Sequence, residues 1–164
     1  MKPAPFALRK YLKVSFMQRI IMLLACVFIA FGAMSQIKDP VKWTATKRKN
    51  ATGYEVVITA ILPKPWHIYS QHTGEGGPVP TSFKFSKNPL LTFSGDVKEV
   101  GKLKEQYDKL FDTQVKYYGE KVDFVQNVKV RGNVKTNVSV TVEYMTCDDS
   151  QCLPPTKKTF NVSL

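Results

Sequence analysis

The chain has 164 residues, of which 24 are Lys or Arg and 13 are Asp or Glu, so its formal net charge is +11. This length supports one domain with a hydrophobic core and leaves no room for a second. The positive charge does not indicate nucleic-acid binding, because basic and acidic residues alternate along 98–109, as they do on a solvated protein surface.

The first 35 residues are typical of a secretory signal peptide. Five basic residues come first, and an apolar run from Ile20 to Ala33 follows them. No acidic residue occurs in this segment. As a helix this run would be about 21 Å long, short of the ~30 Å core of a bilayer, so it is predicted to be a signal core and not a membrane span. Small residues at Ala33 and Ser35 place cleavage before Gln36. The predicted mature chain, 36–164, has a net charge of +6 and is expected in the periplasm.

Removal of this segment would also remove Cys26 and leave Cys147 and Cys152 as the only cysteines. A lipid anchor at Cys26 is disfavoured, because only six apolar residues precede it and the apolar stretch Val27–Phe31 follows it. In an oxidising compartment, an even pair of cysteines is expected to be bonded to itself.

The periodicity of the mature chain is almost entirely that of β-strands, and no window predicts a helix. Gly53–Leu62 is rich in β-branched residues and is predicted to be a buried core strand. Val138–Tyr144 alternates apolar and polar residues, as a half-buried strand does. The charged stretch Gly101–Phe111 is predicted to be mainly a loop. The other predicted strands are Trp66–Ser70, Ser82–Phe85, Leu90–Ser94, Val97–Val100, Lys121–Val130 and Lys158–Leu164.

This pattern indicates an all-β domain. Roughly seven to nine short strands, with a turn signal about every ten residues, favour an immunoglobulin-like antiparallel β-sandwich that forms a single domain. The antibody signature of two distant cysteines with a tryptophan between them is absent.

The two cysteines are separated by four polar residues, in a segment between the last two predicted strands. By the chain-entropy estimate, a disulfide that closes a loop of about six residues contributes only ~2 kcal/mol to stability. A bond meant for stability would join distant strands. The short ring, with Pro154 and Pro155 stiffening its exit, therefore favours a dithiol that opens and closes.

Neighbouring residues leave two interpretations of this loop open. Asp148 and Asp149 would disfavour a thiolate at Cys147, or they would only solvate the turn. The alternative to a redox role for the pair is an exported immunoglobulin-like binding module in which the disulfide pins a hairpin.

A metal site is the other alternative for the cysteines. His67 and His72 would complete a tetrahedral zinc set, and Met145 would suit copper(I). The histidines lie some eighty residues upstream, His67 is in an aromatic strand typical of the core, and an oxidised pair offers no thiolates. No metal and no cofactor are therefore predicted.

Several motifs resemble the N-terminal domain of DsbD, the bacterial membrane thiol:disulfide interchange protein. The main one is Tyr-Met-Thr-Cys-Asp-Asp-Ser-Gln-Cys-Leu-Pro-Pro at 144–155, followed by the closing strand at 158–164. Trp-His-Ile-Tyr at 66–69, Gly-Pro-Val-Pro-Thr at 77–81 and the segment from Phe111 to Tyr118 support it, so the resemblance covers most of the mature chain.

The resemblance implies an immunoglobulin-like sandwich and a protein-disulfide reductase activity. The cysteine pair would take electrons from a thioredoxin-like domain and pass them to oxidised periplasmic proteins. It implies that Cys152 forms the mixed disulfide with partners and that Cys147 resolves it. It also implies an aromatic cap over the pair, for which Phe111 is the best match and Tyr69 the next. Trp66, Tyr144 and Pro154 are further residues expected to pack around the site.

DsbD continues into a membrane domain and a thioredoxin-like domain that have no counterpart in this sequence. The expected reductant is therefore a separate polypeptide, such as a membrane electron transporter, and the domain itself is expected to be a monomer. The sequence does not distinguish service to cytochrome c maturation from general disulfide reduction.

Overall fold

The computed structural model describes residues 39–132 and 134–164. The predicted signal peptide, its cleavage site and Cys26 lie outside these residues. The described part contains strands and no helix, and thus no helix long and apolar enough to cross a membrane. The strands are β1 (Lys42–Asn50), β2 (Gly53–Ile61), β3 (His67–Tyr69), β4 (Ser82–Phe85), β5 (Leu91–Asp108), β6 (Thr113–Val130), β7 (Asn137–Tyr144), β8 (Thr146–Cys147) and β9 (Thr156–Ser163).

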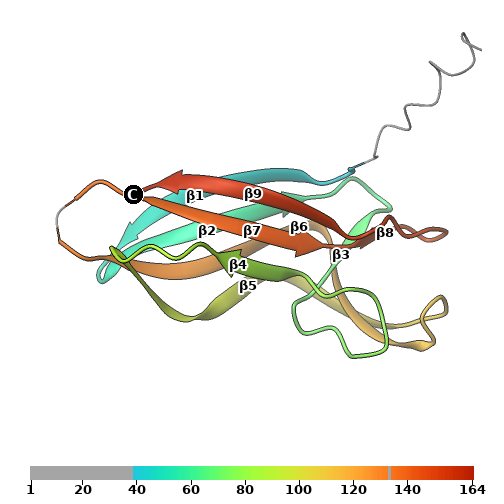
Figure 1. The fold of residues 1–164 in the computed structure, drawn as a ribbon. Coiled ribbons are helices and arrows are strands. Elements are labelled where there is room, and N and C mark those ends of the chain that lie inside the picture. Colours follow the sequence, from blue (N-terminus) through green and yellow to red (C-terminus); the bar gives the residue numbers. More distant parts are fainter. Residues whose placement is uncertain (1–38, 133) are drawn as a thin grey trace, which may run out of the picture. The chain divides into compact units, whose positions relative to one another are not determined.

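These strands form two antiparallel sheets that face each other (Figure 1). The larger sheet has the order β1-β2-β6-β3-β8, with β5 also paired to β6, and the smaller sheet has the order β4-β7-β9. β6 is long enough to pair with β2 over 121–128 and with β3 over 117–119, while β5 pairs with it as well. The predicted immunoglobulin-like antiparallel β-sandwich is confirmed.

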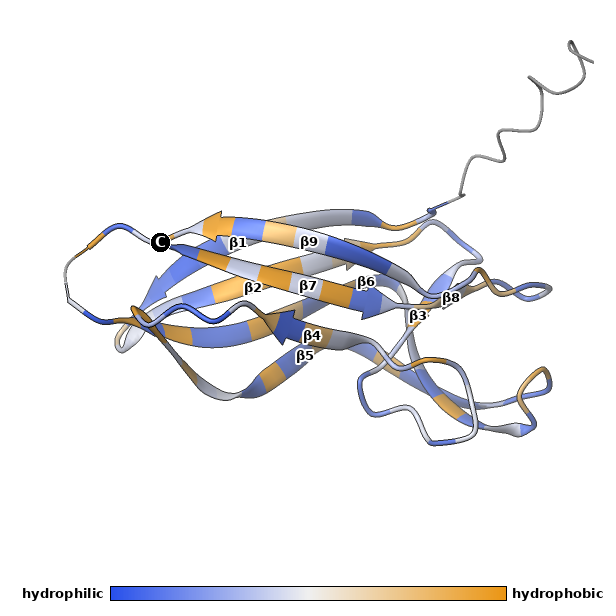
Figure 2. Ribbon diagram, viewed as in Figure 1, coloured by the Kyte–Doolittle hydropathy of each residue, from blue (hydrophilic) through white to orange (hydrophobic). Residues whose placement is uncertain are grey.

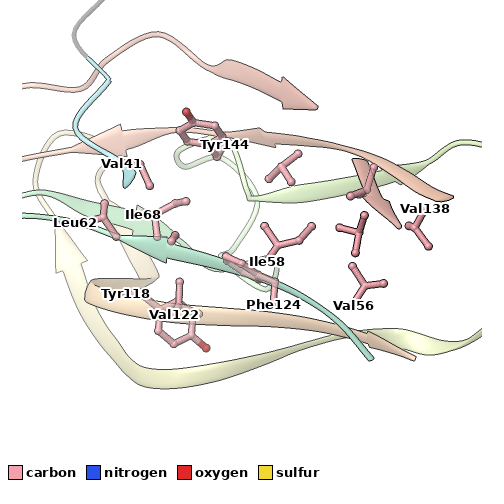
Figure 3. Packing of buried hydrophobic residues seen from close by; sticks show 14 of the residues in the cluster. Val41, Val56, Ile58, Leu62, Ile68, Tyr118, Val122, Phe124, Val138 and Tyr144 are labelled. Atoms are coloured by element: carbon pink, nitrogen blue, oxygen red, sulfur yellow. The ribbon is translucent and has the colours of Figure 1, made fainter. Parts of the chain in front are cut away.

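Alternating valines fill the space between the sheets. In β7, Val138, Val140 and Val142 are fully buried, as the period of two in the sequence predicted. They face Ile58 of β2 and Phe124 of β6 in one continuous cluster (Figure 3). Along these strands, hydrophobic and hydrophilic residues alternate in Figure 2, so each sheet has one apolar face.

The prediction of a loop over Gly101–Phe111 is wrong for most of its length. β5 continues as a strand to Asp108 and, after a register shift between Gly101 and Leu103, stays paired with β6 to the final pair Asp108 and Thr113. Residues 101–107 are exposed on both faces of the strand, so they carry no alternation of apolar and polar side chains. Main-chain hydrogen bonds to β6 hold this second half of β5 in place. Figure 2 shows that it is mainly hydrophilic.

Two further differences concern the first and the last strand. β1 was not among the predicted strands, because only Trp43 and Ala45 give it an apolar face and its second half is basic. The last strand was predicted at Lys158–Leu164 and runs from Thr156 to Ser163.

Candidate redox site

The predicted disulfide between Cys147 and Cys152 is present, with the two α carbons 4.1 Å apart. Cys147 ends the short strand β8, and Cys152 pairs with it as an isolated β-bridge. The Leu153 N–H donates to the Thr146 carbonyl oxygen over 2.9 Å. The two sulfurs thus sit at the base of a tight hairpin loop, at the end of the sandwich where β3 and β8 lie side by side (Figure 1).

Asp148 holds this loop together. Its Oδ1 accepts hydrogen bonds from the Ser150 N–H at 2.9 Å, the Ser150 hydroxyl at 2.8 Å and the Gln151 N–H at 2.9 Å. These bonds, the one from the Ser150 N–H first, lower the pKa of Asp148 to about 2. The sequence left open whether Asp148 disfavours a thiolate at Cys147 or only solvates the turn. In the structure, the contacts of its carboxylate are with Ser150 and Gln151 in the turn itself. Asp149 is exposed.

The disulfide lies against a small hydrophobic cluster that is separate from the main core. Its buried members are Tyr69 of β3, Val115 and Tyr117 of β6, and Cys147 itself. Cys147 is only 1% exposed, whereas Cys152 is half-buried and packs on this cluster from outside. The two sulfurs are therefore unequal in their access to a partner.

Phe111 also packs against this cluster from outside. Its ring lies edge-on to the ring of Tyr69, with centroids 6.3 Å apart. It belongs to the turn between β5 and β6, where the Leu110 N–H donates to Asp108 Oδ1 over 2.8 Å and the Tyr107 hydroxyl donates to Asp112. The structure thus brings Phe111 and Tyr69 to the cysteines.

The other residues expected around the site are Trp66, Tyr144 and Pro154. Trp66 and Tyr144 are buried members of the main core, and the Tyr144 hydroxyl donates to Asp39 over 2.9 Å. Pro154 follows Cys152 by two residues and is exposed. These three residues are not among the side chains of the cluster that holds the disulfide.

His67 is a neighbour of the disulfide that the sequence analysis weighed as a zinc ligand and interpreted as a core residue. Its side chain is buried, and its α carbon is paired with that of Cys147 across β3 and β8. The ring lies 4.6 Å from the ring of Tyr117 and 5.3 Å from that of Tyr69, between centroids. Burial is the main cause that lowers the pKa of His67, opposed in part by a hydrogen bond to Pro65 and by the carboxylates of Asp108, Asp149 and Asp148.

The loop between β3 and β4 is tied to β5 by Glu99, which sequence reasoning also missed. The Glu99 carboxylate accepts hydrogen bonds from the Ser70 hydroxyl and the Gln71 N–H, both at 2.7 Å, and from the Tyr118 hydroxyl at 2.9 Å. These bonds fix the chain directly after Tyr69, and Tyr69 is part of the disulfide cluster. No signal in the sequence links Glu99 to residues 70 and 71, because the link depends on the register of β5.

The metal-binding alternative can be compared with the structure as well. Within 39–132 and 134–164, no group of three or more His, Cys, Asp and Glu side chains is arranged to hold a metal ion. His72 is exposed and His67 is buried.

Solved structures of the same fold are known. One is the reduced N-terminal domain of DsbD from Neisseria meningitidis, which is 17% identical and superposes with a TM-score of 0.50 over 74% of this chain and 85% of that one. Another is the N-terminal periplasmic domain of ScsB from Proteus mirabilis, which is 20% identical, with a TM-score of 0.55 over 76% of this chain and 46% of that one. A search of curated protein sequences found no significant match.

The sequence itself matches the family model described as "Thiol:disulfide interchange protein DsbD, N-terminal" over residues 38–164. This match covers all the strands and both cysteines of the hairpin loop. The chain therefore belongs to the family of DsbD N-terminal domains.

Proposed function

We propose that this domain is a thiol:disulfide interchange module that carries two electrons on Cys147 and Cys152, from a thioredoxin-like donor to oxidised exported proteins. The observation that carries the proposal is the position of the bond. It joins two residues only five apart in sequence, at one end of the sandwich, and neither sulfur belongs to the main core between the sheets. A bond in that position contributes little to the fold, which favours a role in chemistry.

The unequal burial of the sulfurs supports the following order of exchange. The donor thiolate attacks the half-buried Cys152 Sγ, the disulfide breaks, and the electron pair leaves on Cys147. The second donor thiolate then attacks the donor's own sulfur in the mixed disulfide and releases Cys152. The donor ends as a disulfide and this domain as a dithiol. In the reverse sense, Cys152 attacks a substrate disulfide and Cys147 resolves the mixed disulfide.

Exposed apolar side chains on the loops at the same end as the pair support docking of a protein partner. Leu110 is 62% exposed and Tyr107 51% exposed at the turn that carries Phe111, and Val79 is 37% exposed in the loop after β3. Leu153 is half-buried beside Cys152. The loop after β3, the turn between β5 and β6 and the cysteine loop lie at the same end of the molecule (Figure 1). Exposed apolar residues near a reactive group are typical of a protein contact.

We further propose that Phe111 shields the disulfide and moves aside for a partner. Its packing against the cluster of Tyr69 and Cys147 supports this role. A sulfur–aromatic contact favours the closed position by ~0.3–1.5 kcal/mol, which the binding of a partner can reverse.

The proposed setting is the periplasm, reached after removal of the predicted signal peptide 1–35, with a membrane electron transporter as the ultimate source of electrons. Membership of the DsbD family supports it, and one of the structurally similar proteins is described as a periplasmic domain.

The test is to trap the mixed disulfide with a thioredoxin variant that keeps only its attacking cysteine, the second active-site cysteine being serine. A Cys147→Ser variant, pre-activated at Cys152 with a small disulfide reagent, should accumulate a covalent complex on a non-reducing gel, because neither protein then has a thiol that resolves the mixed disulfide. The matched Cys152→Ser variant should give none, because Cys147 is buried. Equal trapping by both variants would contradict the assigned roles, and no trapping by either would contradict the function.

A further inference from the structure

His67 and Cys147 are directly opposite each other on neighbouring antiparallel strands, β3 and β8 (Figure 1). Residues in such register share one face of the sheet, with β carbons about 5 Å apart. His67 is 8% exposed and Cys147 is 1% exposed. The imidazole and the sulfur therefore share a buried site on the same face.

The surroundings keep the imidazole in this place. On its other side, β3 pairs His67 with Gly119 of β6, which has no side chain, so the ring can lie against the diagonal neighbour Tyr117. Tyr69, two residues along β3, covers it edge-on. Tyr69 and Tyr117 are also the two aromatic members of the cluster around the disulfide.

The hydrogen bonds of His67 fit both of its protonation states. The ring makes a hydrogen bond to the backbone of Pro65, and since proline has no N–H, the ring must donate to the carbonyl. Its Nε2 lies 3.3 Å from the Tyr69 hydroxyl, which itself lies 3.4 Å from Asp108 Oδ2. When His67 is neutral, the hydroxyl can donate to Nε2. When Nε2 carries a proton, it donates to the hydroxyl oxygen and the hydroxyl donates to Asp108.

We propose that His67 is the charge partner of Cys147, taking up a proton on reduction of the disulfide and holding the Cys147 thiolate as an ion pair. This inference rests on the proposed thiol:disulfide exchange and adds a residue to it. When the donor thiolate attacks Cys152, negative charge appears on Cys147 beside the imidazole. The proton that the donor thiol released to solvent is taken up at His67, so charge and protons balance. In the reverse sense, the paired thiolate is the species that resolves the mixed disulfide.

The charges that face His67 are consistent with this role. In the oxidised protein the disulfide is neutral, and burial lowers the pKa of His67, so the ring is neutral at pH 7. Asp108 at the end of β5, and Asp148 and Asp149 in the cysteine loop, favour the protonated ring. The same two loop aspartates disfavour a thiolate, so a stable Cys147 thiolate requires a compensating positive charge.

The other titratable groups near the ring are two tyrosines and one lysine. Tyr69 and Tyr117 have raised pKa values, chiefly because of burial, and stay neutral. Lys104 of β5 lies over the ring of Tyr117, with its Nζ 5.8 Å from the centroid. Among the described residues that pack around Cys147, His67 is the one whose charge can change near neutral pH.

The experiment is an NMR titration of the whole domain, oxidised and after reduction with a phosphine, with labelled cysteine β carbons and histidine rings. The proposal predicts that His67 stays protonated to a higher pH in the reduced protein than in the oxidised one. It also predicts that His67→Gln raises the pH at which Cys147 ionises by at least about one unit, as expected for loss of an opposite charge at this distance. His72→Gln is the matched control, because His72 is the chain's other histidine and is exposed, and it should change neither titration.

Two results would overturn the proposal: the same His67 titration in both redox states, or the same Cys147 ionisation in wild type and His67→Gln. If His67→Gln does not fold, the comparison of the two redox states of the wild-type protein still decides. The titration needs no protein partner. Failure of this inference therefore leaves exchange with thioredoxin intact, and failure of that exchange leaves the titration interpretable.

Discussion

The two hydrophobic clusters of this domain are built from different side chains. The main core consists largely of valines and other apolar residues of β2, β6 and β7, held by packing between the sheets. The cluster around the disulfide consists of two tyrosines, one valine and a cysteine, and hydrogen bonds to Asp108 and Gln106 hold the tyrosine hydroxyls. The first cluster fills the space between the sheets, whereas the second lies on β3, β6 and β8, next to the loop that holds the disulfide, where we propose that a partner binds.

The largest expected effect is in the main core. Phe124 is 1% exposed and contacts the rings of Trp43 and Phe83 at 6.3 and 4.8 Å between centroids. Phe124→Ala should lower the free energy of unfolding by about 3–5 kcal/mol, because it leaves a cavity between the sheets. Urea denaturation measures this loss. A change below about 1 kcal/mol would mean that the core does not depend on this ring.

Removing the disulfide should cost less than removing one core ring. The Cys147→Ser, Cys152→Ser double variant should fold and lose about 2 kcal/mol or less, because the bond closes a very small loop. Wild-type protein reduced with a phosphine is the matched control and should show a similar loss in urea. A double variant that remains unfolded would show that the bond is structural, and would favour the binding-module alternative.

A smaller effect is expected at Phe111. Phe111→Ala should leave the fold intact and speed oxidation of the reduced domain by a small disulfide about 2- to 10-fold, the factor that corresponds to a contact of ~0.3–1.5 kcal/mol. Leu110→Ala is the control, because Leu110 is its exposed neighbour in the same turn. Rates are read by alkylation and mass spectrometry. Equal rates in wild type and Phe111→Ala would show that Phe111 does not shield the sulfurs.

The smallest effect concerns Asp148, and it depends on pH. Hydrogen bonds in the folded loop lower its pKa from the ordinary value of 3.8 to about 2, so they favour the charged form. The stabilisation is therefore present at neutral pH and is lost as the pH falls from 3.8 towards 2. Asp148→Ala should be less stable than wild type at pH 7 and should approach it near pH 2 in thermal denaturation. A difference that is the same at both pH values would mean that the carboxylate charge is not what holds the loop.

The fold could be predicted from the sequence where burial on one face imposes a period of two. β7, with Val138, Val140 and Val142 inward, is the clearest case. The prediction failed for the second half of β5, where both faces are exposed and the backbone pairing with β6 leaves no trace in the side-chain pattern. β1 was missed for a related reason, since only Trp43 and Ala45 pack inward.

The site shows the same limit. The cysteine pair could be found from spacing alone, and the resemblance to a known family indicated Phe111 and Tyr69. His67 was visible in the sequence, but its pairing with Cys147 depends on the register of β3 and β8, which joins residues eighty positions apart. Asp108 was assigned to a loop and lies instead at the end of a strand, beside Tyr69. Residues that are brought together by the pairing of strands far apart in the sequence cannot be recognised as neighbours from the local sequence pattern.

The most direct test of the central claim is the redox equilibrium of the wild-type domain with thioredoxin. Oxidised domain is mixed with reduced thioredoxin, and separately reduced domain with oxidised thioredoxin, before acid quenching, alkylation and mass spectrometry of both proteins. An exchangeable Cys147–Cys152 pair predicts that the two mixtures reach the same ratio of dithiol to disulfide. A domain disulfide that stays intact in the presence of reduced thioredoxin, while the reduced domain stays reduced in the other mixture, would contradict the account.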